Sequence, residues 1–358
     1  MNMELPVDKK LEINRLAQIY NNTSATYKFY WFVSLLDIFV KTGKKQISFW
    51  EIIAGMITEA WYPIHYFRLS FGKSDSLYDQ AVELQKLLNI PIDSNKNQIY
   101  LHIIDNIETP RVKSLLRVFS FNVPYRFLSP WIIYTTKEDV VTLSKNFTNN
   151  CLYAINGESI EINPNWEQYL NDHYLILRDF TFWNLTVFLQ KRNPNVPDVP
   201  SKLIKPIQRD SLIKQRNFWD TFIEINGSIE CIYTGKLLHK REYDLDHFIP
   251  WSFVSHDLLW NLLPADPSIN SSKCNNLPLL DKYLVPFART HQKAIQAIYI
   301  KKPNNKLLED YLMLHDSISD LVMFSESDFL NIFKKTFNPM VQIAENMGFK
   351  YWYTPLKL

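Results

Sequence analysis

The sequence predicts a mainly helical α+β protein that carries one small strand–strand–helix unit. Three observations lead to this prediction. Apolar residues recur at helical spacing through most of roughly the first 200 residues. A segment with four prolines at 193–206 (NPNVPDVPSKLIKP) then interrupts the helical pattern. Beyond it, two short strand-like runs, Tyr243–Phe248 and Trp260–Leu263, precede a further helical region.

The first half contains two helices with clear end signals. One is predicted to begin at a cap formed by Thr23 or Ser24 and to end at Gly43, because a left-handed glycine commonly closes a helix. The second begins at the capping-box pattern Ser48-Phe-Trp-Glu51 and ends at Pro63. Further helical patterns lie at 79–90, 98–118 and 165–192, and the Asn156-Gly157 pair predicts a β-hairpin before the last of them.

The second half is predicted to contain a short helix at 209–225, a turn-rich segment at 226–280, and helices near 283–300, 306–320 and 327–347. We therefore divide the chain into four regions. They are a helical N-terminal domain (1–192), a proline-rich linker (193–206), a small domain (207–282) and a C-terminal helical region that packs on that domain (283–358).

The charge balance excludes a protein that binds nucleic acid through its bulk charge. The chain has 39 basic and 37 acidic side chains, so its formal net charge is only +2. Any affinity for nucleic acid must come from a local basic patch. Each candidate for this patch either contacts DNA or is only solvated. The candidates are Lys202, Lys205, Lys214, Arg216, Lys240 and Arg241.

Cysteine usage and hydropathy exclude other classes. The three cysteines are widely spaced and form no CxxC motif, so neither a disulfide framework nor a four-ligand zinc site is expected. The most apolar stretch, Phe29–Val40, contains Asp37 and is 12 residues long, whereas a bilayer span needs about 20. No secretory signal is visible at the N-terminus. We expect a soluble, cytoplasmic protein without membrane contact.

The segment Cys231–Pro278 concentrates residues that can perform chemistry. Asp246 and His247 are adjacent in the first strand-like run, so their side chains point to opposite faces. Asn261 lies in the second run. Asn270 and Lys273 are three apart in a predicted helix and therefore share one face. Strand, strand and helix can thus bring these side chains to one point.

This segment resembles the HNH, or ββα-metal, endonucleases. The resemblance rests on the pattern D-x-D-H-x-x-P-x-S-F beginning at Asp244, followed by Asn261 and by N-x-x-K from Asn270 to Lys273. The spacing is most similar to the HNH domain of type II CRISPR effector nucleases. It covers about 50 of the 358 residues and is highly specific within that span.

The resemblance implies a role for each matching residue. Asp246 and Asn270 would bind the catalytic metal, and His247 would be the general base. Asn261 would tie the loop between the strands, and Lys273 would place positive charge near the scissile phosphate. Asp244 lies on the same side of the strand as Asp246 and could support it. His256 and Asp257, in the loop between the strands, are interpreted as a solvated or loop-bracing pair.

The cofactor prediction follows from the donor atoms. A pair of oxygen ligands suits Mg²⁺ or Mn²⁺ better than Zn²⁺. Many HNH proteins also carry two CxxC pairs around a structural zinc. Here only Cys231 and Cys274 fall near those places, so no structural zinc is expected and the surrounding helices must brace the unit.

The resemblance therefore implies a metal-dependent endonuclease that hydrolyses DNA and leaves 5′-phosphate and 3′-hydroxyl ends. Resemblance and an Asn-, Ile- and Lys-rich composition favour a prokaryotic defence or mobile-element system. One alternative is a nucleic-acid-binding or complex-assembly subunit whose nuclease site is activated only by a partner, which would bind through the N-terminal domain. Another is an RNA-directed nuclease or toxin.

Overall fold

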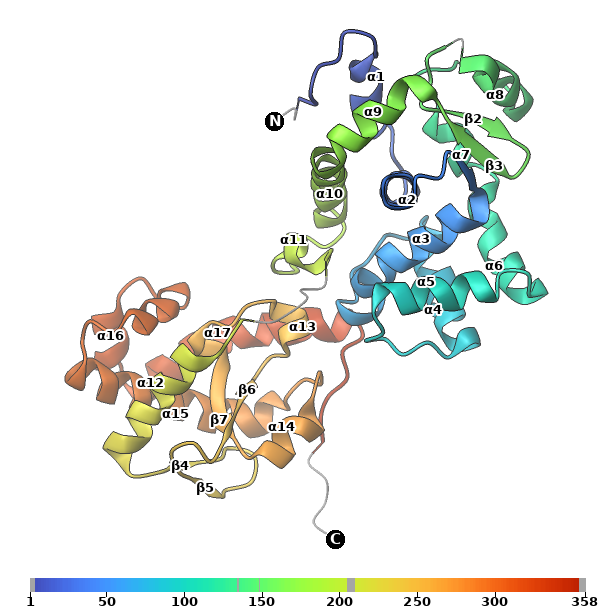
Figure 1. Ribbon diagram of the computed structural model, residues 1–358. Helices are drawn as coiled ribbons and strands as arrows, with labels where there is room; N and C mark the ends of the chain where they lie inside the picture. The colour runs from blue at the N-terminus through green and yellow to red at the C-terminus, as the bar shows by residue number, and fades with distance from the viewer. Residues whose placement is uncertain (1–3, 134, 148, 205–209, 354–358) are drawn as a thin grey trace. The chain divides into compact units, whose positions relative to one another are not determined.

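The computed structural model describes residues 4–133, 135–147, 149–204 and 210–353 (Figure 1). It confirms the predicted fold class, since the chain is mainly α-helical with small sheets. It divides into two compact units. The N-terminal unit comprises Met1–Pro194 with Val199–Lys205, and the C-terminal unit comprises Asn195–Asp198 with Pro206–Leu358.

The N-terminal unit consists of helices around one small antiparallel sheet. Its helices are α1 (Ile13–Ala17), α2 (Tyr27–Thr42), α3 (Phe49–Trp61), α4 (Ser76–Leu88), α5 (Lys96–Asp105), α6 (Pro110–Ser120), α7 (Val123–Phe127), α8 (Lys137–Ser144), α9 (Pro164–Asp172), α10 (Tyr174–Gln190) and α11 (Val199–Lys202). Short π and 3₁₀ segments lie at Tyr62–Tyr66 (η1) and Lys145–Phe147 (η2). Its strands are β1 (Gln46–Ser48), β2 (Tyr153–Asn156) and β3 (Ser159–Ile162).

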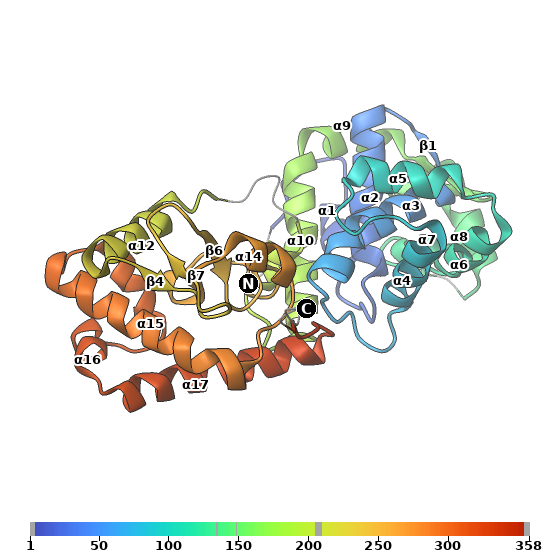
Figure 2. The same ribbon diagram turned by 90° about the horizontal axis from the view of Figure 1, so that it is seen from below.

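Helices α2 and α3 form the centre of this unit and lie side by side (Figures 1 and 2). Gly43 closes α2 at φ 70°, and Ser48 with Glu51 forms the capping box of α3, as predicted. Helix α2 begins at Tyr27, later than the predicted cap at Thr23 or Ser24. The backbone N–H of Thr26 instead donates to Asp75 at 2.6 Å, so a distant carboxylate sets this helix start.

Three of the predicted helical patterns end or divide differently from the prediction. Pro63 ends α3 as an α-helix, but the chain continues for one turn as the π-helix η1. The pattern at 98–118 is split into α5 and α6 because Pro110 starts a new helix. The pattern at 165–192 is split into α9 and α10 at His173.

The sheet of the N-terminal unit has the strand order β1-β3-β2. The predicted hairpin is confirmed, with Asn156 opposite Ser159 and Gly157 in the turn at φ 61°. The sequence did not predict β1, which pairs Gln46 with Glu161.

The C-terminal unit surrounds two short antiparallel strand pairs with helices. Its helices are α12 (Ile213–Asn226), α13 (Trp251–Val254), α14 (Pro267–Lys273), α15 (Leu280–Lys301), α16 (Ile318–Met323) and α17 (Glu326–Asn346), with 3₁₀ segments η3 (Leu259–Asn261) and η4 (Lys306–Met313). The pairs are β4 (Ile229–Glu230) with β5 (Leu237–Leu238) and β6 (Asp244–His247) with β7 (Leu262–Ala265).

One hydrophobic core runs through the C-terminal unit, from Phe218 in α12 to Trp352 near the C-terminal end. Phe248, just after β6, stacks on Phe287 of α15 with ring centroids 3.9 Å apart. Helices α15 and α17 therefore share a core with the β6–β7 pair. Among the described residues, no helix is long and apolar enough to cross a membrane.

Candidate active site

The antiparallel pair β6–β7 positions the first two candidate residues. Asp246 lies opposite Leu263 and His247 lies opposite Leu262. Strand alternation turns the two side chains to opposite faces, and Asp246 is buried whereas His247 is half-buried. Helix α14 packs beside β6 (Figure 1). Strand and helix thus meet at Asp246, as the sequence predicts.

The Asp246 carboxylate is held by a donor on each oxygen. The hydroxyl of Tyr233 donates to Oδ2 at 2.6 Å, and Nζ of Lys273 donates to Oδ1 at 3.1 Å. Burial, followed by the charge of Asp246, raises the pKa of Tyr233 well above its ordinary value, so its hydroxyl remains a donor. Each carboxylate oxygen still has a second lone-pair direction for another ligand.

Lys273 is completely buried. Its ammonium also donates to the backbone carbonyl of His247 at 2.6 Å. The resemblance implies that Lys273 places positive charge near the scissile phosphate. In the structure its charge neutralises Asp246 and fixes the end of β6, because a buried cation needs charged or polar partners.

A carboxylate from the following loop holds the imidazole of His247. Nε2 of His247 lies 2.7 Å from Oδ1 of Asp257. Gln215 of α12 donates to the backbone carbonyl of Asp257 at 3.0 Å, and Asp310 accepts from the backbone N–H of Leu259. Nδ1 of His247 has no hydrogen-bond partner within the described parts of the chain. A proton on Nε2 therefore leaves Nδ1 as an acceptor.

Asn261 ties the chain just beyond His247. Its amide donates to the carbonyl of Ile249 at 2.9 Å and accepts from the N–H of Ile249 at 2.8 Å. Its backbone carbonyl also accepts from Phe248. Asn261 is fully buried in η3, and β7 begins two residues later than the predicted strand. Its contacts connect the two sides of the loop that carries Asp257.

Asn270 lies one helical turn before Lys273 on α14, so both side chains share the face that meets Asp246. Its amide has no side-chain hydrogen bond to any other described residue. No group of three or more His, Cys, Asp or Glu side chains in the described ranges could hold a metal ion. The donors offered here are instead one carboxylate and one amide, an oxygen set that fits Mg²⁺ or Mn²⁺.

The C-terminal end of the chain braces helix α14. The indole of Trp352 donates to Ser272 at 3.0 Å, and Leu277 exchanges backbone hydrogen bonds with Lys350 and Trp352. Asp266 caps the helix through Ser268. Hydrogen bonds from Ser268 and Lys236 lower the pKa of Asp266, which keeps the cap ionised. These contacts position the helix that carries Asn270 and Lys273.

Asp244 lies at the opposite end of β6 from His247, where it faces Ala265. It is half-buried and makes no side-chain hydrogen bond to another described residue. The structure therefore brings together four predicted residues through direct hydrogen bonds or a shared backbone contact, Asp246, His247, Asn261 and Lys273, but leaves Asp244 outside this network.

The predicted basic residues that the structure describes differ in their exposure. Lys202 is buried in the N-terminal unit, contrary to the expectation of an exposed contact residue. Lys205 lies outside the described residues. Arg216 donates to the carbonyl of Tyr243 at 2.8 Å and is half-buried.

The remaining basic candidates belong to the C-terminal unit and are exposed. Lys240 forms an ion pair with Glu224, while Lys214 and Arg241 extend from α12 and from a turn. Lys214 lines a hollow of about 750 Å³ together with Asp257 and His256. Lys214 is therefore the basic candidate that lies beside the His247–Asp257 pair.

Two residues of the site were missed by sequence reasoning. Asp257 was interpreted as a solvated or loop-bracing residue, and Tyr233 was not considered. Neither sits at a spacing fixed by a strand or a helix. The signal that could have identified Asp257 was an acidic residue in the loop that follows the strand of His247. Of the two cysteines in this segment, Cys231 is buried and Cys274 is exposed.

Comparison with known proteins supports the same segment. No curated protein and no solved structure matches the chain. Residues 231–279 match the family model described as HNH endonuclease; nothing specifically supports similarity to CRISPR effectors. HNH nucleases generally depend on a divalent metal. The match includes Tyr233, Asp246, His247, Asp257, Asn261, Asn270 and Lys273, and it suggests that the C-terminal unit carries a nuclease that acts on nucleic acid.

Proposed function

We propose that this protein is a metal-dependent endonuclease that hydrolyses phosphodiester bonds in DNA, with its site in the C-terminal unit. The observation that carries the proposal is the orientation of His247. Asp257 engages Nε2, while Nδ1 has no partner among the described residues. This is the arrangement required of a neutral imidazole that accepts a proton from water.

The chain's own residues would divide the work. Nδ1 of His247 accepts the proton of the attacking water, and Asp257 stabilises the imidazolium that results. Asp246 and Asn270 would hold Mg²⁺ or Mn²⁺, which would supply charge stabilisation at the phosphate. Lys273 and Tyr233 orient Asp246, and Asn261 holds the backbone beyond His247. The resemblance implies 5′-phosphate and 3′-hydroxyl products.

A second candidate is a nuclease site that becomes active only with a partner. Asp246 is 2% exposed, and both of its oxygens already accept hydrogen bonds. A metal ion must therefore reach a buried carboxylate beside the ammonium of Lys273, which a rearrangement would ease. We propose that the N-terminal region 1–192 would receive such a partner or contribute to DNA recognition.

The test is incubation of the purified chain with plasmid DNA and with single-stranded RNA, each with Mg²⁺ and with EDTA. We expect metal-dependent cleavage of DNA and none by Asp246→Ala. Cleavage in EDTA, or by the variant, contradicts the site assignment. Cutting of RNA alone supports the RNA-directed alternative. An inert chain that nevertheless binds Mn²⁺ through Asp246 supports the partner-activated candidate. A role as a prokaryotic defence or mobile-element protein is part of the proposal and rests on the resemblance alone.

A further inference from the structure

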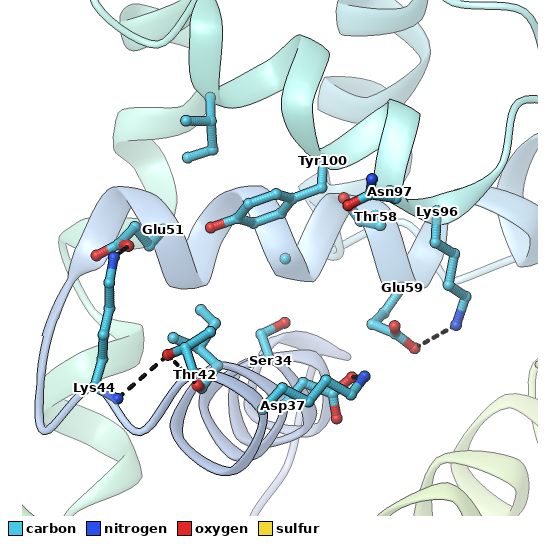
Figure 3. Close-up of a pocket in the computed structure, with 14 residues that line it drawn as sticks. Ser34, Asp37, Thr42, Lys44, Glu51, Thr58, Glu59, Lys96, Asn97 and Tyr100 are labelled. Atoms are coloured by element: carbon cyan, nitrogen blue, oxygen red, sulfur yellow. Dashed lines mark hydrogen bonds and ion pairs between the residues drawn. The ribbon is translucent and has the colours of Figure 1, made fainter.

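The N-terminal unit contains a cavity that the proposed nuclease chemistry does not use. It has a volume of about 580 Å³ and lies between α2, α3 and α5. Its size falls within the range of roughly 300–1,000 Å³ that is typical of small-molecule sites. Figure 3 shows side chains from all three helices directed toward this space.

The cavity is long and has a carboxylate toward each end. Glu51 and Glu59 belong to the same helix, α3, eight residues apart. At about 1.5 Å of rise per residue, their backbones are separated by roughly 12 Å along the helix axis. Tyr100 of α5 lies between them (Figure 3). Ile38 and Ile104 add apolar surface to the lining of the cavity.

The carboxylates are the inner members of their ion pairs. The exposed side-chain fractions are 24% for Glu51, 8% for Glu59 and 15% for Asp37, against 53%, 34% and 60% for their lysine partners. The pairs are Lys44–Glu51 at 2.5 Å, Lys96–Glu59 at 2.8 Å and Lys41–Asp37 at 2.6 Å. Asp37 also pairs with the equally buried Arg178, so its charge is already neutralised, and Arg178 lies 3.9 Å from Glu59. The protein loses little stability when Lys44 and Lys96 turn into solvent. Glu51 and Glu59 then lack their lysine partners and favour an added cation over an anion.

The floor of the cavity offers further hydrogen-bond acceptors. Ser34 is 2% exposed, and its hydroxyl has no hydrogen-bond partner in the described part of the chain. Gly55 keeps this floor open, because a Cβ at its position would lie 2.8 Å from the Ser34 hydroxyl. Thr58 donates its proton to the carbonyl of Ala54 and keeps its lone pairs available.

We propose that this cavity binds a linear aliphatic polyamine of the length of spermidine. Its outer ammonium groups would lie at Glu51 and Glu59, in place of Lys44 and Lys96, and its methylene chain would lie along Tyr100. With single bonds of about 1.5 Å, such a molecule spans roughly 11 Å when extended. The ring face of Tyr100 also attracts an inner ammonium group. This inference does not depend on the nuclease proposal.

Isothermal titration calorimetry of the full chain, freed of nucleic acid, tests the proposal with spermidine as the probe. We expect one spermidine per chain. Glu51→Gln and Glu59→Gln should each weaken binding about tenfold or more, because each removes one charge-assisted hydrogen bond. Putrescine reaches only one carboxylate at a time and should bind at least tenfold more weakly than spermidine.

The matched control is Glu83→Gln in the same unit, since Glu83 pairs with Arg111 away from the cavity. It should bind spermidine as the unaltered chain does, as should His247→Ala. Absence of binding to the unaltered chain overturns the proposal without requiring any variant to fold. Equal affinity in Glu51→Gln, Glu59→Gln and Glu83→Gln, or binding of inorganic phosphate in preference to spermidine, also overturns it.

Discussion

Each unit contains an ion-pair network around a carboxylate, and the two networks differ in how many donors the carboxylate has. In the N-terminal unit, Asp37 accepts hydrogen bonds from Lys41, Arg178 and Tyr174. Arg178 also lies 3.9 Å from Glu59, so it connects α10 to α2 and α3. In the C-terminal unit, Asp246 accepts from Lys273 and Tyr233. Beside it lies His247, with Nδ1 unpaired among the described residues.

The difference lies in how fully each carboxylate is satisfied. Burial by itself would raise the pKa of Asp37, but the charge of Arg178 and the hydrogen bonds from Lys41 and Arg178 outweigh it and lower the pKa. Asp37 is therefore an ionised and saturated structural residue. Asp246 is more deeply buried and has fewer donors, so it retains lone pairs for a metal ion. An incompletely satisfied buried carboxylate beside an oriented histidine is the stronger sign of a reaction site.

The largest expected effect is the loss of the base. His247→Ala should lower single-turnover cleavage of a labelled duplex by about 10²–10⁴-fold, the usual contribution of general-base catalysis. Asp257→Asn should lower it comparably, since an amide that donates to Nε2 places the imidazole proton on Nδ1, and since the charge that stabilises the protonated imidazole is lost. His256→Ala is the control and should cost far less. If His256→Ala were inactive and His247→Ala active, the assignment of the base would be wrong.

The second prediction separates a reaction site from a structural ion pair. Lys273→Met leaves Asp246 buried without its cation, which should cost about 3–5 kcal/mol of unfolding free energy. Millimolar Mn²⁺ should restore part of this loss, because the ion binds the folded carboxylate. Denaturant unfolding with and without Mn²⁺ measures both effects. An identical loss in both conditions contradicts metal binding at Asp246.

The corresponding change in the N-terminal unit should show no such rescue. Arg178→Met removes the cation shared by Asp37 and Glu59, but Lys41 and Lys96 remain. Because the site is partly exposed, we expect a smaller loss of about 1–3 kcal/mol. Unfolding curves with Mn²⁺ and without it should coincide. Rescue by Mn²⁺ here would mean that the two networks do not differ in the way proposed.

The residues of the site were predictable to the extent that regular structure fixes their spacing. Strand alternation relates Asp246 to His247, and a helical turn relates Asn270 to Lys273. Asp257 and Tyr233 reach the site from a loop and from the β4–β5 connection, whose paths depend on packing. No local pattern specifies them.

In the fold, too, features set by local chemistry were predicted, and features set by distant contacts were not. Capping residues such as Ser48 and Gly43 identified helix ends, since their chemistry is local. Strand β1 pairs Gln46 with Glu161, far along the sequence, and was missed. Lys202 was taken for a surface residue from composition alone, but it is buried in the N-terminal unit.

The two units should also differ in their response to acid. Burial lowers the pKa of His65 to about 4 and that of His291 to about 3. The unfolded chain binds these protons near its ordinary pKa of about 6.5, so stability is complete above that pH and falls as pH decreases toward the folded pKa. At pH 5, each histidine should lower the free energy of unfolding by roughly 2 kcal/mol. For His291, whose folded pKa is the lower of the two, the loss of stability should continue to grow at still lower pH.

Urea unfolding between pH 7 and pH 5 measures this dependence. His291→Gln should flatten the pH dependence of the C-terminal unit, and His65→Gln that of the N-terminal unit. The exposed His239 provides the control, and His239→Gln should leave both slopes as they are. Unaltered slopes in the two buried variants would show that other groups carry the acid sensitivity.

The smallest expected effect tests which unit contacts DNA. Lys214 is exposed beside Asp257, whereas Lys113 of the N-terminal unit is paired with Glu108. Lys214→Glu should reduce the log–log dependence of DNA affinity on salt by about 0.9, the value for one phosphate contact on a duplex. Lys113→Glu should leave it unchanged. Affinity measured for an uncleaved duplex in EDTA at several salt concentrations decides between the units. A reduced slope in Lys113→Glu alone would place the DNA contact on the N-terminal unit, and Lys214 would then be a solvated residue.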